Sequence, residues 1–207
     1  ATGKPIVAVL MAGRPLVLPT DIQSRLSGLV MAYLPGTQGG AALADALYGR
    51  AGFPGRLPFT WPDSLTQVGL WSDRPAEGAG ETPLPLYPLG YGLDYTTSVA
   101  RDLTVTPAPD GVTAQATLTN TGEKAGTVLV LLRASLPASG ALQATSRPVG
   151  VLRAVLKPGE SRAVQVTVSR ERLSSWVGDA YGPGAWQLLP GTYTLSAGDG
   201  KAPLTLP

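Results

Sequence analysis

Two continuous apolar runs constrain the fold of this chain more than any other feature. Residues 6–11 and 29–34 contain no polar side chain apart from the hydroxyl of Tyr33. Such runs are typical of parallel strands that are buried on both faces of a sheet. A parallel sheet normally has more than two or three strands and is covered on both sides. We therefore expect another segment or chain to complete the sheet.

The residues around these runs predict two helices and a further strand. Thr20 is placed to cap a short helix over residues 21–27. Gly39 begins a second helix, and Gly49 follows it at the position that favours a left-handed C-cap. The apolar face of this second helix consists of Ala42, Leu43, Ala46 and Leu47. Residues 57–61 predict a short edge strand, because a proline interrupts them.

From about residue 100 the pattern changes to that of an all-β protein. Four apolar residues alternate with polar ones in the first clear strand: Val112, Ala114, Ala116 and Leu118. Residues 127–132 are apolar on both faces, which suits a central strand, and residues 164–168 alternate again. Turn residues at 157–160 and at 190–191 separate the later strands. Short strands at this spacing predict a sandwich of the immunoglobulin type.

Composition excludes several classes of function. The chain has no histidine and no cysteine, which excludes histidine-based triads, thiol nucleophiles, zinc fingers and disulfides. The net charge is only +2 and the basic residues are scattered, so we expect no nucleic-acid partner. No apolar run approaches the ~20 residues of a membrane-spanning helix. The sequence begins without an initiator methionine or a signal peptide, and we expect a processed or cut N-terminus.

Several ordered motifs resemble the C-terminal part of family 3 glycoside hydrolases, the β-glucosidases and their relatives. In the first half these motifs are YLPGTQGG at 33–40, ADALYG at 44–49, GRLPFTWP at 55–62 and GYGLDY at 90–95. In the second half they are LTNTG at 118–122, RPV at 147–149, LKPGES at 156–161 and PGTY at 190–193. The resemblance covers nearly the whole chain.

The resemblance implies a division into an α/β part followed by an all-β part. Residues 1–62 would be the C-terminal part of an α/β sandwich with a mostly parallel sheet, completed by another segment. Residues 63–99 would be an irregular connector. Residues 100–207 would form an immunoglobulin-like β-sandwich of the fibronectin type III-like kind.

The resemblance also implies that the catalytic residues lie outside this chain. Family 3 enzymes are retaining, with an aspartate nucleophile on a (β/α)8-type barrel and a glutamate acid/base earlier in the α/β sandwich. Neither motif occurs here, so we assign no catalytic residue, metal site or cofactor to the chain. We expect the C-terminal segment of an exo-acting β-glycosidase, a β-glucosidase or exo-β-glucanase that acts on terminal β-linked sugars. Its partner would be an N-terminal barrel segment, present as a separate or nicked chain, and the family is commonly periplasmic or secreted.

Two residues are our candidates for binding substrate. Arg14 follows the first strand between a glycine and a proline, at the edge where α/β sheets bind ligands. The alternative role for Arg14 is to clamp its loop against the barrel domain. Trp71 lies in the connector and offers an apolar face to a sugar. Glu77 and Glu81 could reach a neighbouring active site, although we favour solvated loop acids.

The other acids and aromatics have structural interpretations. We expect Asp45 to make a polar contact on its helix, and Asp94 and Glu160 to form turns. The aromatics that we assign to the interior, its cover or a domain interface are Trp61, Tyr91, Trp176 and Trp186.

Two other functions are open to a chain of this kind. One is a non-catalytic module that binds carbohydrate or protein, although residues 112–119 and 127–132 carry none of the aromatics that such a sheet usually exposes. The other is a purely structural adhesion domain, which would account for residues 100–207 but leave the α/β half unexplained.

Overall fold

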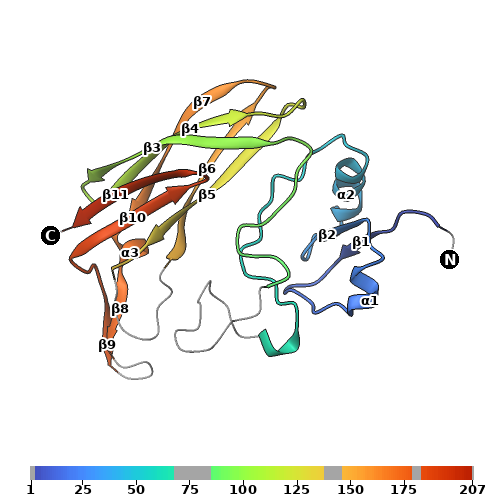
Figure 1. The fold of residues 1–207 in the computed structure, drawn as a ribbon, viewed down its shortest axis with the longest axis horizontal. Helices are drawn as coiled ribbons and strands as arrows, with labels where there is room; N and C mark the ends of the chain where they lie inside the picture. The colour runs from blue at the N-terminus through green and yellow to red at the C-terminus, as the bar shows by residue number, and fades with distance from the viewer. Residues whose placement is uncertain (1–2, 68–84, 138–145, 179–182, 207) are drawn as a thin grey trace. The chain divides into compact units, whose positions relative to one another are not determined.

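The structure is a computed structural model that describes residues 3–67, 85–137, 146–178 and 183–206. The chain divides into two compact units (Figure 1). Of the described residues, the first unit comprises 3–51, 57–67 and 85–91, and the second comprises 52–56 and those from 92 to 206. The predicted fold class, an α/β part followed by an immunoglobulin-like β-sandwich, is confirmed.

The first unit contains the two predicted parallel strands. β1 (Val7–Leu10) pairs with β2 (Gly28–Met31) in a two-stranded parallel sheet. No residue of either strand is buried. Parallel strands are normally covered on both faces, whereas the described residues cover this sheet only in part.

A short helix, α1 (Thr20–Gln23), lies between these strands in the sequence. The prediction that Thr20 caps the helix is wrong, because Thr20 is its first residue and Pro19 is the N-cap. The carbonyl oxygen of Pro19 accepts the N–H groups of Ile22 and Gln23, both at 3.0 Å. Proline fixes φ near the helical value, which helps the chain to enter the helix at this point.

The second helix, α2 (Gly39–Leu47), ends as the sequence predicts. Gly49 has φ +75°, its N–H donates to Ala46 O at 3.1 Å, and the N–H of Arg50 donates to Asp45 O at 2.8 Å. These two bonds form a Schellman motif, which ends a helix with a residue in the left-handed region. The predicted apolar face is largely uncovered: Ala46 is buried, Leu43 is half-buried, and Ala42 and Leu47 are exposed.

The strand predicted over residues 57–61 does not form. Trp61 and Tyr87 make a single antiparallel bridge, and Leu57 exchanges hydrogen bonds of 2.8 Å with Tyr91 O and Gly90 N–H. Pro58 lies between these contacts and has no N–H to donate, so the ladder cannot continue. A short 3-10 helix, η1 (Leu65–Gln67), follows.

The second unit is an antiparallel β-sandwich (Figure 1). One sheet has four strands in the order β11-β10-β5-β6, and the other has three in the order β3-β4-β7. The elements of this unit are β3 (Ser98–Ala108), β4 (Gly111–Asn120), β5 (Gly126–Ser135), β6 (Ser146–Leu156), β7 (Ser161–Ser169), α3 (Arg170–Leu173), β8 (Ser175–Gly178), β9 (Gly184–Gln187), β10 (Gly191–Ala197) and β11 (Gly200–Leu206). β8 and β9 form a separate two-stranded sheet.

The core of the sandwich lies between the two larger sheets. All four alternating residues of β4 are buried, as predicted. From the opposite sheet they meet Val128, Leu132, Leu152 and Leu195 in one cluster. β5 lies between β10 and β6, so the prediction of a central strand over residues 127–132 is also confirmed.

Candidate functional site

The candidate site of the first unit is the edge at which β1 and β2 end. Leu10 and Met31 are the last partners of the parallel ladder, and the N–H of Ala32 donates to Leu10 O at 2.9 Å. Ligands of α/β sheets bind beyond the carboxyl ends of the strands. The segments that leave this edge are residues 11–19 after β1 and residues 32–38 after β2.

Arg14 lies in the first of these segments, at a bend after Gly13. A Cβ added to Gly13 would lie 3.9 Å from Leu34 Cδ1, so the two segments pass close together. Arg14 is exposed, and its side chain makes no hydrogen bond or ion pair with any residue that the structure describes. Its five N–H donors are therefore available to a carboxylate or to hydroxyl groups.

Trp61 fixes the loop that carries Arg14. The indole is 1% exposed, and its Nε1–H donates to Leu16 O at 3.0 Å. Around it, Phe59 lies at a ring distance of 6.5 Å and Tyr87 at 6.1 Å, the latter edge to face. The interior position predicted for Trp61 is confirmed, and its role here is to hold the loop.

Two tyrosines extend this aromatic cluster. Tyr91 stacks on Tyr87 at 4.7 Å between ring centroids and is 37% exposed. Tyr33 contacts Phe59 edge to face at 6.1 Å, directly after the end of β2, and burial raises the pKa of its phenol.

Tyr33 is a candidate that the sequence interpretation did not single out. Its φ of +56° is uncommon for a residue other than glycine, and such strained positions cluster at functional sites. The signal that could have drawn attention to it is the Pro35-Gly36 pair at the end of the apolar run. The other predicted candidates, Trp71 and the connector acids Glu77 and Glu81, lie outside the described residues.

Asp94, in the second unit, has the structural role that was predicted. Its Oδ1 accepts the N–H groups of Tyr95 and of Phe53, both at 2.7 Å, which joins segments 41 residues apart. A Cβ at Gly52 would lie 2.7 Å from that oxygen, and a Cβ at Gly92 would lie 2.5 Å from Gly55 O. Glycine at position 92 therefore lets the backbones of the motifs at 55–62 and 90–95 approach closely here.

Asp45, in the first unit, is an exposed partner of Arg50, with 2.7 Å between Oδ1 and Nε. The contact on α2 that the sequence predicts is therefore present. It holds the side chain beside the end of the helix, where the N–H of Arg50 also donates to the Asp45 carbonyl.

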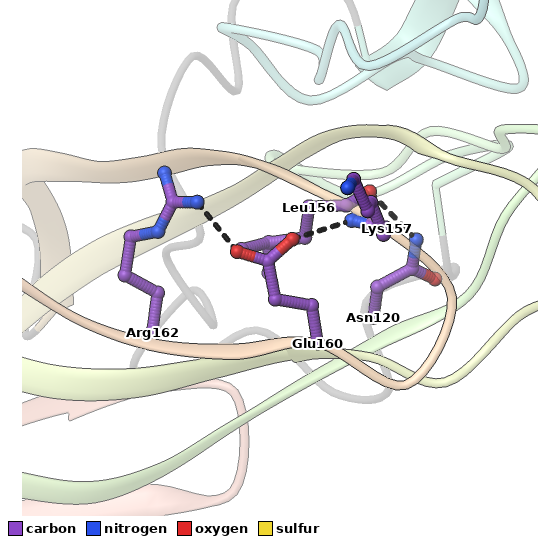
Figure 2. Close-up of polar contacts among 5 residues, drawn as sticks. All are labelled: Asn120, Leu156, Lys157, Glu160 and Arg162. Carbon is purple, nitrogen blue, oxygen red and sulfur yellow. Dashed lines mark hydrogen bonds and ion pairs between the residues drawn. The ribbon is translucent and has the colours of Figure 1, made fainter.

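Glu160 stabilises the turn between β6 and β7, as predicted (Figure 2). Its carboxylate accepts the N–H of Lys157 at 2.8 Å and pairs with the Arg162 guanidinium. The Lys157 N–H first, and then Arg162, hold the pKa of this carboxyl below its ordinary value. A general acid requires the opposite shift, so this environment does not suit Glu160 to glycosidic acid catalysis.

The tryptophans of β8 and β9 differ in exposure. Trp176 is half-buried, and its predicted role in covering the core stays a prediction, because it is not among the residues that pack against the core cluster. Trp186 is 60% exposed, so the same prediction is wrong for this residue. β9 pairs only with β8 in the described part of the chain and does not join either sheet of the sandwich, which leaves Trp186 uncovered.

The described residues contain no group of three or more acidic, histidine or cysteine side chains that could hold a metal ion. Among the helices that they form, none is long and apolar enough to cross a membrane.

Comparison with known proteins identifies relatives of both halves. The family described as "Glycosyl hydrolase family 3 C-terminal domain" matches residues 1–95, and the "Fibronectin type III-like domain" matches residues 134–201. The chain is 37% identical over 200 residues to a "Periplasmic beta-glucosidase" of Salmonella typhimurium, which covers 85% of this chain and 25% of that protein.

Solved structures agree with these matches. A β-glucosidase involved in saponin metabolism from intestinal bacteria is 26% identical, with a TM-score of 0.82 over 100% of this chain and 31% of its own. A β-glucosidase from Streptomyces venezuelae, solved in complex with D-glucose, is 26% identical with a TM-score of 0.79, over 98% of this chain and 29% of its own. The chain thus spans about a quarter of the length of the curated relative from Salmonella. It belongs to glycosyl hydrolase family 3 and corresponds to the C-terminal part of that family's proteins.

Proposed function

We propose that the chain is the C-terminal segment of a retaining, exo-acting β-glycosidase, with β-glucosidase or exo-β-glucanase activity toward terminal β-linked sugars. The names of its relatives support the β-glucosidase assignment. In a retaining mechanism a nucleophilic carboxylate and an acid/base carboxyl lie ~5–5.5 Å apart on either side of the scissile bond. Both groups would come from an N-terminal segment that contains the barrel, on a separate or nicked chain.

The observation that carries this proposal is the incomplete sheet of the first unit. β1 and β2 have no buried residue, and several large apolar side chains of the first unit are exposed. They include Val7 in β1 at 51%, Met11 after β1 at 69%, Leu34 after β2 at 78% and Tyr48 at the end of α2 at 81%. An apolar parallel sheet left open to water is unfavourable, so we infer that another segment covers and extends it.

The chain itself would complete the α/β sandwich, hold the part with the acid/base residue against the barrel, and shape the rim of the cleft. We propose that Arg14 contributes to that rim, because its guanidinium lies at the carboxyl edge of the sheet without a described partner. We propose Trp71 as a sugar-lining aromatic on the sequence argument alone.

Three of the described carboxylates are engaged in structural contacts, which supports the absence of catalysis in the isolated chain. Asp94 is occupied by two backbone N–H groups, and Asp45 and Glu160 pair with arginines. We therefore expect the 207-residue chain alone to show no turnover of an aryl β-glucoside. Turnover should appear when the chain is combined with the N-terminal segment, and activity of the chain alone would contradict the proposal.

Arg14→Ala tests the substrate-binding part of the proposal in the combined enzyme. We expect KM for the aryl β-glucoside to rise about tenfold, since a charged hydrogen bond contributes about 1.5–3 kcal/mol. Arg25→Ala is the matched control, because Arg25 is another exposed arginine of the first unit. Equal kinetics of the two variants would indicate that Arg14 does not contact substrate.

The incomplete sheet also weighs against a self-sufficient binding module. Such a module would fold and remain monomeric without another segment to cover β1 and β2. A cooperatively unfolding, monodisperse monomer of residues 1–207 would therefore favour the module over the enzyme segment.

A further inference from the structure

The ribbon of β8 and β9 carries two tryptophans on one face. Trp176 and Trp186 are directly opposed across the antiparallel pair. Their ring centroids are 5.8 Å apart and their planes are inclined by 72°. Opposed residues of an antiparallel pair lie on the same face, and edge-to-face aromatic pairs stabilise such contacts. The pair therefore explains how an otherwise marginal two-stranded ribbon is held together.

The two rings have different environments. A Cβ added to Gly184 would lie 2.6 Å from Trp176 Cζ2, so the Trp176 ring lies directly over this glycine. Trp176 is half-buried in that position, whereas Trp186 remains 60% exposed. The contact with Trp176 thus accounts for the position of Trp186 but leaves most of its surface open to a ligand.

The two strands of the ribbon carry no charged side chain. Ser175–Gly178 and Gly184–Gln187 contain no aspartate, glutamate, lysine or arginine. A partner recognised by charge would find no ion-pairing group on these strands. The Trp186 side chain offers a flat apolar face and an indole N–H that makes no hydrogen bond with the described residues. A ligand that matches this surface is uncharged and combines an apolar face with hydroxyl groups.

We propose that Trp186 is a surface binding site for a pyranose ring of a β-linked glucan. The C–H face of the sugar stacks on the indole, and one sugar hydroxyl accepts the Nε1–H. The choice of a β-linked glucan rests on the proposed glycosidase function, whereas the requirement for an uncharged, hydroxyl-bearing ring follows from the ribbon itself.

The test is affinity electrophoresis of the combined enzyme in a gel that contains a soluble β-1,3/1,4-glucan. We expect the glucan to retard the wild-type enzyme and Trp186→Ala to weaken its apparent affinity about three- to tenfold. Trp186→Phe should retain most of the retardation, because it keeps an aromatic face. Val177→Ala is the matched control, since Val177 lies on the opposite face of the same ribbon and is 38% exposed.

Two results would overturn the site at Trp186. One is an unchanged affinity for the glucan in Trp186→Ala. The other is an intact glucan affinity in both Trp186 variants together with a lower melting temperature or dissociation of the chain from the N-terminal segment. That result would identify Trp186 as a contact within the protein. Aryl β-glucoside turnover in the same samples tests the proposed function separately. If the wild-type enzyme is retarded but does not turn over the glucoside, the glycosidase assignment fails while the Trp186 site stands.

Discussion

Asn120 offers the sharpest test of how the β-sandwich is held together. It is fully buried, and its amide Nδ2 donates to Leu156 O at 3.1 Å, as Figure 2 shows, and to Lys124 O at 2.8 Å. Its Oδ1 accepts the Thr96 hydroxyl at 2.6 Å and the Gly122 N–H at 3.0 Å. One side chain thus joins the end of β6 to the turn before β5 and to the segment before β3.

Replacing Asn120 by alanine removes all four bonds. Each contributes about 1 kcal/mol, and a partner left buried without water adds a desolvation cost. Three of the four bonds are only partly buried, so water can replace some of them. We expect Asn120→Ala to lower the free energy of unfolding by about 2–4 kcal/mol, which is roughly 10–20 °C in melting temperature for a domain of this size.

The measurement is urea unfolding of the combined enzyme, in which the N-terminal segment covers the first unit, followed by tryptophan fluorescence. Thr119→Ala is the control, because Thr119 precedes Asn120 on β4 and its hydroxyl makes one exposed contact of 2.8 Å with Ser161. This control should lose no more than about 0.5 kcal/mol. If Asn120→Ala loses as little as the control, the buried amide does not organise these turns.

Two further predictions concern the helix end and the pH dependence. Gly49→Ala should destabilise the chain by about 1 kcal/mol, because φ at this position is +75°. Gly40→Ala should stabilise it by about 0.5–1 kcal/mol, because Gly40 lies within α2 with open space around it and alanine favours the helix. The melting temperatures of the two variants should shift in opposite directions, and shifts of the same sign would refute the role of the left-handed cap. Glu160 has a lowered pKa in the folded chain, so its stabilising contribution is present above the unfolded pKa of about 4.3 and is lost as the pH falls through the folded value. In Glu160→Gln, the free energy of unfolding should therefore fall less between neutral pH and a pH below about 4 than it does in the wild type. Urea unfolding at the two pH values measures this fall, and an equal fall in both proteins would show that the Glu160 carboxylate is not linked to folding.

The elements that the sequence predicted are those fixed by local pattern. β4 alternates because one face meets the core, and each of its four apolar residues is buried as the period of two requires. Gly49 was predicted because a left-handed C-cap favours glycine whatever its surroundings. The apolar runs predicted β1 and β2 because such composition is typical of parallel strands, which are normally covered on both faces.

The elements that the sequence did not reveal depend on distant partners. Residues 57–61 can form a strand only by hydrogen bonding with residues 87–91, and Pro58 interrupts this series of hydrogen bonds. Asp94 was recognised as a turn residue, but its bond to Phe53 links positions 41 residues apart. The exposure of Trp186 follows from the sheet order, in which β9 has β8 as its one neighbour among the described strands, and residue type carries no information about that order.

The central claim is that the first unit requires another polypeptide segment to cover β1 and β2. The most direct test is size-exclusion chromatography with intact mass spectrometry on the native protein that carries these residues. We expect them to elute with a larger polypeptide, either bound to it or continuous with it. A single species of 21.3 kDa that stays monomeric and unfolds cooperatively would contradict the claim.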